Sequence, residues 1–258
     1  MAELAAYRWA SGSVTKLIRR IARLARPTLL FEPGGSRSFS KLGGDPQLPP
    51  KAAWPAGAEG PRAFLAQVDL GEVSDLARID WLPAEGRLYA FLDPSTFGAP
   101  DLVRITFSTE APGPPARQPE GVAERYRERR VEFTPLNSVP SLEWLDVRDP
   151  LDLEFEEFEA RLQEFGAQPP REDRLHRIGG YPDGLQNGCL GLECEHLARG
   201  LPPPDYVTPA AIERASREWR LLLQIDSDRD LGMEFGDAGR LYVFIREATP
   251  AWAISVRP

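Results

Sequence analysis

Residues that build many common functional sites are scarce in this chain of 258 residues. It has two cysteines, Cys189 and Cys194, and two histidines. A secreted scaffold of this length held by disulfides would usually carry more cysteines. A histidine-based active site would rest on His176 or His196, and neither lies in a recognisable catalytic motif.

Long apolar stretches are missing as well. No segment approaches the roughly 20 apolar residues that a transmembrane helix needs, and no signal-peptide core follows the N-terminal Met1-Ala2-Glu3. The sequence also lacks a phosphate-binding glycine loop and a Gly-x-Ser-x-Gly nucleophile turn. We therefore expect a cytoplasmic protein that needs no cofactor.

The charge is uneven along the chain. The net charge of −8 should repel nucleic acid and anionic membranes, so we expect no nucleic-acid partner. Residues 1–26 nevertheless carry +5, and residues 13–26 have the spacing of a basic amphipathic helix that ends at Pro27. Such a helix can lie on an anionic membrane or dock on the acidic body of its own chain. The short apolar face, which lacks aromatic residues, favours docking on the chain.

Proline is frequent, with 26 residues, and it predicts many turns and few long helices. Alternating and continuous apolar runs predict short strands, and apolar residues at helical spacing predict two further helices. The expected strands are 28–31, 63–70, 86–92, 102–107, 130–133, 220–225 and 240–245, and the expected helices are 153–165 and a segment running from Thr208 toward Trp219.

Three sequence blocks occur twice in the same order. They pair residues 41–46 with 177–182, 64–69 with 221–226, and 86–91 with 239–244. The offsets of 136, 157 and 153 residues place 21 extra residues between the first two blocks of the second copy. Ordered self-similarity of this kind predicts a structural unit used twice, packed about a pseudo-twofold axis.

These patterns predict an α+β fold that is rich in antiparallel strands. We expect one globule made of two similar halves with peripheral helices. The predicted divisions are a basic amphipathic helix at 1–26, a first half at 27–150 and a second half at 151–258.

The same blocks carry a family resemblance. The segments that show it are 40–49 (SKLGGDPQLP), 64–70 (FLAQVDL), 179–183 (GGYPD), 222–228 (LLQIDSD) and 236–242 (GDAGRLY). As a set they resemble the YwqG-like family of bacterial proteins of unknown function, over residues 27–247. Phe235 stands where that family often has Trp. The resemblance implies a shared architecture and no particular activity.

Two Gln-x-Asp triplets are candidates for a site. Gln67 and Asp69 in the first half correspond to Gln224 and Asp226 in the second, and residues two apart on a strand share one face. These side chains either satisfy the backbone of nearby turns in both copies or line a binding cleft in which the two aspartates face each other. Paired carboxylates can perform acid–base chemistry or hold a cation.

The second Gly-Gly turn adds Tyr181 and Asp183 to the predicted cleft. The acidic segment 226–237 offers Asp226, Asp228 and Asp230 as metal ligands, at positions 1, 3 and 5 of a calcium loop. The required glycine at position 6 is Leu231, and position 12 is Asp237 and not Glu. A solvated acidic hairpin loop is therefore the favoured interpretation of this segment.

Zinc is a weaker alternative. Cys189, Cys194 and His196 lie in one cluster, whereas a structural zinc site needs four ligands, usually in two close pairs.

No motif supplies a complete catalytic constellation. We therefore expect a non-enzymatic binding or protein-interaction protein that uses the cleft or surface between its halves, with another protein or a small ligand as partner. The alternative is a metal-dependent or hydrolase-like enzyme that uses Asp69, Asp226 and Asp228 at that cleft.

Overall fold

The computed structural model describes most of the chain. The described residues are 18–19, 21–36, 38–96, 102–139, 176–183, 190–204, 209–237, 239–246 and, as backbone, 249–257. The helix predicted at 153–165 and the boundary predicted at residue 150 lie outside these ranges. Of the helix predicted at 13–26, residues 18–19 and 21–26 are described. Residues 18–19 and 21–22 are helical, but residues 23–24 form a turn and Arg26 already begins β1, so the predicted helix end is wrong.

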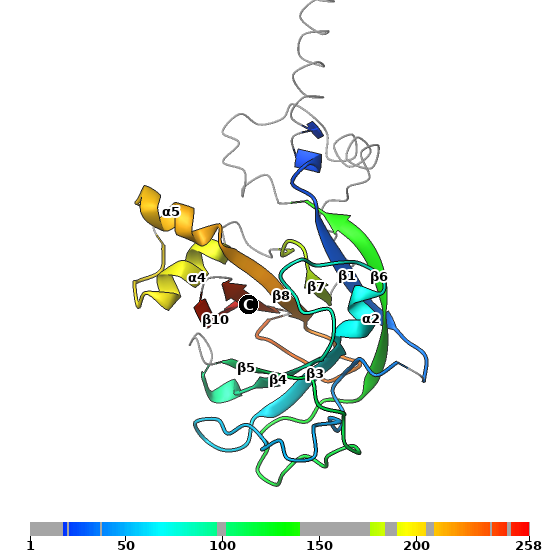
Figure 1. Cartoon of the computed structure of the whole chain (residues 1–258). Coiled ribbons are helices and arrows are strands. Elements are labelled where there is room, and N and C mark those ends of the chain that lie inside the picture. Colours follow the sequence, from blue (N-terminus) through cyan, green and yellow to red (C-terminus); the bar gives the residue numbers. More distant parts are fainter. Residues whose placement is uncertain are drawn as a thin grey trace, which may run out of the picture.

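Ten strands in the described residues form one antiparallel sheet. They are β1 (Arg26–Pro33), β2 (Lys41–Leu42), β3 (Ala63–Asp69), β4 (Arg87–Leu92), β5 (Val103–Ser108), β6 (Arg129–Ser138), β7 (Arg177–Gly179), β8 (Trp219–Asp226), β9 (Arg240–Arg246) and β10 (Thr249–Arg257). Their order across the sheet is β10-β9-β8-β7-β1-β6-β2-β3-β4-β5. The sheet curves into a nearly closed barrel (Figure 1).

The prediction of an α+β fold is wrong, because the protein is mostly β. The described helices are short: α2 (Leu70–Ser74), α4 (Leu190–Ala198), α5 (Ala210–Ser216) and the 3₁₀ turn η1 (Pro94–Thr96). The helix expected to run from Thr208 toward Trp219 stops at Ser216, since Trp219 already pairs with Arg246 in the sheet. Strands that lie far apart in the sequence form a single sheet, and the short described helices pack against it without forming a second layer.

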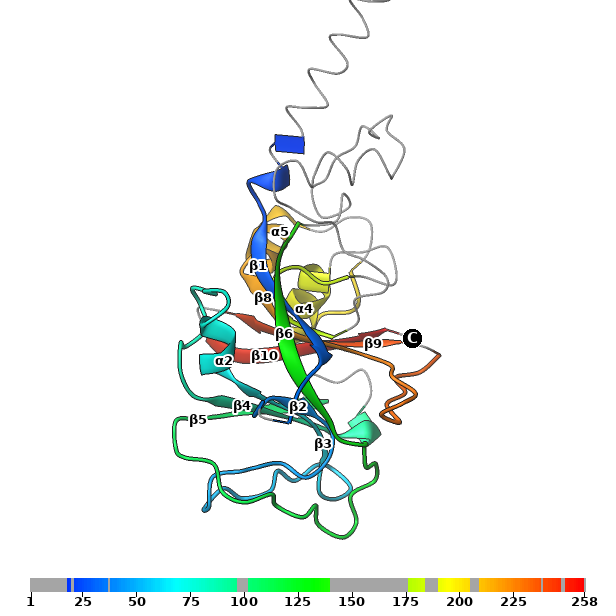
Figure 2. The ribbon, with the colours of Figure 1, turned by 90° about the vertical axis from the view of Figure 1, so that its right-hand side faces the viewer.

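The strand order has the same pattern from either end. The series β2-β3-β4-β5 on one side of the central pair matches β7-β8-β9-β10 on the other side. In the centre β1 pairs with β6, and the register places Phe31 opposite Phe133. In the chain β1 comes before the series β2 to β5, but it pairs with β7 of the other series. Likewise β6 comes before the series β7 to β10 but pairs with β2. The two series are therefore joined through this exchange of the central strands β1 and β6 (Figure 2).

The repeated blocks occupy matching places in this sheet. Both short strands, β2 and β7, run into a pair of glycines with positive φ, Gly43-Gly44 and Gly179-Gly180. At Gly180 a side chain would overlap the Thr28 hydroxyl, so glycine is required there for space as well as for its backbone angle. The pairings of β3 with β4 and of β8 with β9 each contain one irregularity, between Phe64 and Ala66 and between Leu221 and Leu223.

Both faces of the sheet carry buried apolar side chains. Alternate residues such as Val68, Leu88, Ile225 and Leu241 share one large apolar core on the inner face, and each such side chain stabilises the fold by about 1.5–3 kcal/mol. Two smaller clusters lie on the opposite, outer face. One contains Leu48, Phe64, Tyr89 and Phe91, and the other contains Leu190, Cys194, Trp219, Leu221, Tyr242 and Phe244.

The helices follow from this arrangement. Helix α4 contacts β8 and β10 and supplies Leu190 and Cys194 to the outer cluster of the second series. Helix α2 follows β3 directly and places Leu70 and Val73 in the inner core, at the end of the barrel where β3 ends and β4 begins (Figure 2). Within the described ranges, no helix has the length and apolar character required to cross a membrane.

Candidate functional site

Gln67 and Asp69 lie at the end of β3 and take part in dense local hydrogen bonding. The Gln67 side chain accepts a hydrogen bond from the Gln47 backbone N–H at 2.9 Å and donates one to the Phe39 carbonyl at 2.7 Å. Asp69 caps α2, because its Oδ1 accepts from backbone N–H groups of the first helical turn. Its other oxygen lies 3.1 Å from Arg87 Nε. Both side chains of the first pair therefore have protein partners.

Gln224 and Asp226 have matching positions at the end of β8. Gln224 Oε1 accepts a hydrogen bond from the Asp183 backbone N–H at 2.9 Å. Asp226 Oδ2 accepts from Arg240 Nε at 2.6 Å. All four of these residues are buried, so the second pair lies in the interior and not on an open surface.

Four charged side chains form what we call the second-half cluster: Arg177, Asp183, Asp226 and Arg240. Arg240 bridges the two aspartates, with its Nη1 2.6 Å from Asp183 Oδ2, and Arg177 Nη2 lies 3.8 Å from the same oxygen. Burial raises the pKa of Asp183 although both arginines oppose that shift, and burial lowers the pKa of Arg177. Buried charges of this kind require their partners, because an isolated buried charge is strongly unfavourable.

Tyr181 has different contacts. Its backbone N–H donates to Ser138 Oγ at 3.0 Å, and its hydroxyl donates to the Leu24 carbonyl at 2.9 Å. The Arg26 guanidinium lies 4.2 Å from the centre of its ring, at a distance that allows a cation–π interaction. These contacts tie Tyr181 to Leu24, to the start of β1 and to the end of β6, whereas Asp183 belongs to the second-half cluster.

The two Gln-x-Asp pairs have parallel surroundings but lie apart in the sheet. Tyr89 donates its hydroxyl to the Gln47 carbonyl at 2.9 Å, and Tyr242 donates its hydroxyl to the Asp183 carbonyl at 2.7 Å. In the sheet order, β7, β1, β6 and β2 separate β8 from β3. Among the described contacts, no hydrogen bond or ion pair joins Asp69 to Asp226. Their facing arrangement across a cleft stays a prediction.

The acidic hairpin between β8 and β9 is attached to the sheet. Asp228 forms an ion pair with Arg129 and lies 3.4 Å from His176 Nε2, and Asp230 lies 3.4 Å from Arg129 Nη2. The hydrogen bond with His176 is the largest cause that holds the pKa of the Asp228 carboxyl below its usual range, and the contacts with Arg129 act in the same direction. In the part of the chain that the structure describes, no three His, Cys, Asp or Glu side chains come together as a metal-binding group.

The cysteine and histidine cluster is described only in part. Cys194 is buried on α4, and Cys189 lies outside the described residues. His196 Nδ1 is 2.6 Å from the Pro202 carbonyl oxygen.

Sequence reasoning missed the basic partners of the aspartates. Arg87 and Arg240 both occupy the second position of the repeated Gly-Arg-Leu-Tyr block, directly opposite the aspartates in the strand register. This repeated position was the available signal. His176 was considered from the sequence only as one of two histidines without a motif, and its contact with the end of β8 was not predicted. Its Nδ1 accepts from the Asp226 backbone N–H at 3.1 Å, as Ser40 Oγ accepts from Asp69 at 2.9 Å.

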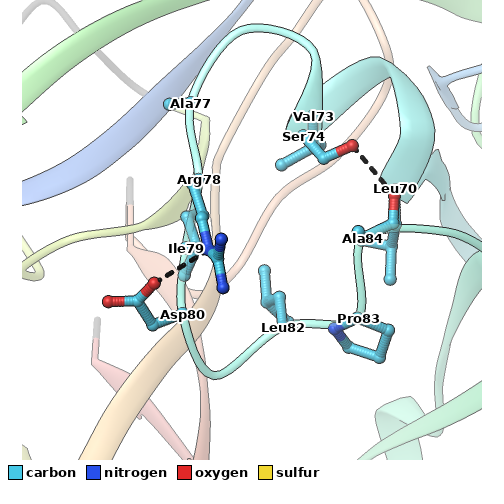
Figure 3. Close-up of a pocket in the computed structure, with 10 residues that line it drawn as sticks. All are labelled: Leu70, Val73, Ser74, Ala77, Arg78, Ile79, Asp80, Leu82, Pro83 and Ala84. Atoms are coloured by element: carbon cyan, nitrogen blue, oxygen red, sulfur yellow. Dashed lines mark hydrogen bonds and ion pairs between the residues drawn. The ribbon is translucent and has the colours of Figure 1, made fainter.

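A cavity of about 420 Å³ lies between α2 and the loop that returns to β4, and we call it the barrel-end cavity (Figure 3). Polar and apolar groups share its walls about equally. An ion pair between Arg78 and Asp80 at 3.1 Å is exposed at the rim. Ile79 reaches so close to Gly179 of β7 that a side chain there would overlap it. The lining residues are Leu70, Val73, Ser74, Ala77, Arg78, Ile79, Asp80, Leu82, Pro83 and Ala84.

A second hollow of about 320 Å³ lies on the outer face of β4 and β5, and we call it the outer groove. Its floor is formed by Tyr89, Phe91 and Thr106, and its far wall is the proline-containing segment 48–55. Neither hollow was predicted from the sequence, because their walls are built from ordinary loop and strand residues without a motif.

Comparison with known proteins gives a family and no activity. No curated protein matches the chain. The family described as a domain of unknown function, DUF1963, matches residues 40–249, and the chain therefore belongs to that family.

Proposed function

We propose that this protein is a non-enzymatic binding protein whose ligand site is the barrel-end cavity. The observation that carries the proposal is the cavity itself. Its volume of about 420 Å³ falls within the roughly 300–1,000 Å³ of small-molecule sites. We also infer from the sequence motifs that, within the DUF1963 family, the chain is of the YwqG-like type.

The lining of the cavity suggests the chemistry of its ligand. Val73 and Ile79 are buried, and Leu82 is half-buried, so the inner wall suits an apolar body. The exposed Arg78 and Asp80 at the rim can pair with a polar or charged end group. A small amphiphilic molecule, with its apolar part inward, fits both features.

The contacts of the candidate aspartates support binding over catalysis. Asp69 caps a helix and pairs with Arg87, and Asp226 pairs with Arg240. A carboxylate engaged in this way has little freedom to accept a proton from a substrate. The metal-dependent alternative predicts instead that calcium, magnesium or manganese raises the melting temperature and that Asp228→Asn abolishes the increase.

A fluorescent amphiphile tests the proposal. Anilinonaphthalene sulfonate combines an apolar body with an anionic group, and its fluorescence rises on entering an apolar site. We expect saturable binding to the full chain that Ala84→Trp weakens by at least about tenfold, because Ala84 lines the rim and is exposed. The matched control is Ala53→Trp, the same change at an exposed alanine of the outer groove. Binding that is unchanged by Ala84→Trp, or lost equally in both variants, would refute the assignment.

A further inference from the structure

The barrel-end cavity is built by a connection that differs between the two strand series. Between β3 and β4 the chain forms α2 and the loop that follows it, whereas between β8 and β9 it forms the acidic hairpin. The residues that line the cavity all lie within 70–84, in the first series. One of them, Ile79, also contacts the second series.

The cavity runs from an exposed rim to a buried floor (Figure 3). Arg78 and Ala84 are exposed, Leu82 is half-buried, and Val73 and Ile79 are buried. The last two side chains also belong to the inner core of the barrel. An apolar chain that enters from the rim therefore ends against Val73 and Ile79.

Ile79 contacts the backbone of β7 as well as the cavity. A methyl group added at Gly179 would lie 2.6 Å from Ile79 Cδ1 and 3.6 Å from its Cγ1. These separations place the end of the Ile79 side chain directly over the Cα of Gly179. Glycine at this position of the second series therefore leaves the space that Ile79 occupies.

The matching glycine of the first series meets a different obstacle. A methyl group at Gly43 would overlap the carbonyl oxygen of Arg127, which is backbone and cannot move aside. At Gly179 the obstacle is the far end of a side chain, and the Pro27 carbonyl oxygen, at 3.1 Å, limits movement on another side. A side chain at position 179 would therefore displace Ile79.

The cavity is the space into which Ile79 can move. Protein interiors are close-packed and have few voids larger than a water molecule, and Ile79 is otherwise surrounded by the inner core. A displaced Ile79 side chain therefore reduces the depth of the cavity, whereas a shortened one increases it.

We propose that Ile79 sets the length of the apolar part of the ligand that the barrel-end cavity accepts. Gly179 is the positioning residue that allows Ile79 to lie back against β7. This inference rests on the proposed function and names the specificity determinant of that site. The second series thus takes part in selectivity, although the lining residues come from the first.

Straight-chain alkyl sulfonates, from hexyl to dodecyl, test the proposal. They share the anionic group of anilinonaphthalene sulfonate, and displacement of that probe from the full chain gives the affinity of each one below its micelle concentration. Each methylene that enters an apolar site strengthens binding about fourfold. Affinity should therefore rise with chain length and level off once the chain reaches the floor, and the chain length at that point is the readout.

The variants should move this limiting length in opposite directions. Ile79→Ala should increase it by about two methylenes and Ile79→Val by about one, because each leaves space at the floor. Gly179→Ala should decrease it by about one methylene. The matched control is Gly232→Ala, since Gly232 has a φ of +74° against +75° at Gly179 but has open space around it. This control should leave the limiting length unchanged.

A double variant separates displacement of Ile79 from a general loss of structure. In Ile79→Ala/Gly179→Ala the added methyl no longer meets Ile79 Cδ1, so the limiting length should equal that of Ile79→Ala alone. Thermal unfolding shows whether each variant is folded, and Ile79→Val takes the place of Ile79→Ala in both tests if the alanine variant does not fold.

The proposal is overturned if the limiting length is the same in all folded variants, if Gly179→Ala increases it, or if Gly179→Ala acts equally with and without Ile79. These outcomes differ from failure of the proposed function. If no sulfonate displaces the probe from the unmodified chain, or if Ala84→Trp leaves displacement unchanged, the cavity is not the ligand site and both proposals fail.

Discussion

Replacing Arg240 by methionine removes the guanidinium that bridges Asp183 and Asp226 in the second-half cluster. The side chain of Arg240 is 6% exposed and its nitrogens lie 2.6 Å from an oxygen of each aspartate. Its counterpart in the first series is Arg87, which is 23% exposed and pairs with Asp69 at 3.1 Å. Methionine preserves most of the apolar stem in both cases, so the pair of variants isolates the effect of the charge in two environments.

The expected cost differs because burial differs. Removing one partner of a buried ion pair costs about 3–5 kcal/mol, since an uncompensated charge stays in the interior. Removing one partner of a partly solvated pair costs about 1 kcal/mol or less. Arg240→Met should therefore lower the free energy of unfolding by about 3–5 kcal/mol, and Arg87→Met by about 1 kcal/mol.

Urea unfolding followed by circular dichroism measures both effects, with the m-value checked for constancy. The difference should depend on pH. Burial already raises the pKa of Asp183, and loss of Arg240 raises it further. When the pKa of a carboxyl is higher in the folded than in the unfolded protein, the free energy of unfolding falls as the pH rises through the folded-state pKa. The deficit of Arg240→Met should thus grow as pH rises from about 4 to 7. Equal costs for the two variants, or a deficit that shrinks with rising pH, would refute this reasoning.

Three further outcomes are expected. Gly180→Ala should lower the free energy of unfolding by more than about 2 kcal/mol, because the alanine would have positive φ and would also overlap a neighbouring side chain. Gly200→Ala has positive φ in open space and should lower it by about 1 kcal/mol, and thermal unfolding measures both changes. Asp228→Asn should lower stability at pH 7, and the deficit should narrow as pH falls below about 4, because the lowered pKa of this carboxyl stabilises the fold only while it is ionised. In a Cys189→Ser background, Cys194 should react with a thiol reagent only as fast as the protein opens, since its side chain is fully buried.

Local chemistry explains why several elements could be predicted from sequence. The expected strand at 63–70 is β3, Ala63–Asp69, because a continuous apolar run suits a strand buried on both faces. The Gly-Gly pairs at 43–44 and 179–180 have positive φ, which glycine adopts without strain. In each case the signal and the structure lie within a few residues of each other.

The pairing of distant segments could not be predicted in this way. Strands β2 and β7 have two and three residues, which is too short for any periodic signal, yet they connect the central strands to the rest of the sheet. The partners of the candidate aspartates are equally non-local, since Arg240 reaches both Asp226 and Asp183, which lie far apart in the chain. The fold class was misjudged for the same reason, because single strands do not reveal that they share one sheet.

Positions that make the same contacts in both strand series stabilise the fold, whereas positions that differ between the series are free to serve a function. Gln67 and Gln224, Tyr89 and Tyr242, and the opposed Asp–Arg pairs make the same contacts in both strand series.

The differences lie at a few equivalent positions. Asp183 replaces Gln47 and closes the second-half cluster with its carboxylate. Helix α4 replaces segment 48–55 as the cover of the outer aromatic side chains. Tyr89 and Phe91 are as fully buried as Tyr242 and Phe244, so two different covers keep the same pair of rings away from solvent. The strand pairing does not depend on which element forms the cover, because the shared contacts already account for it in both series.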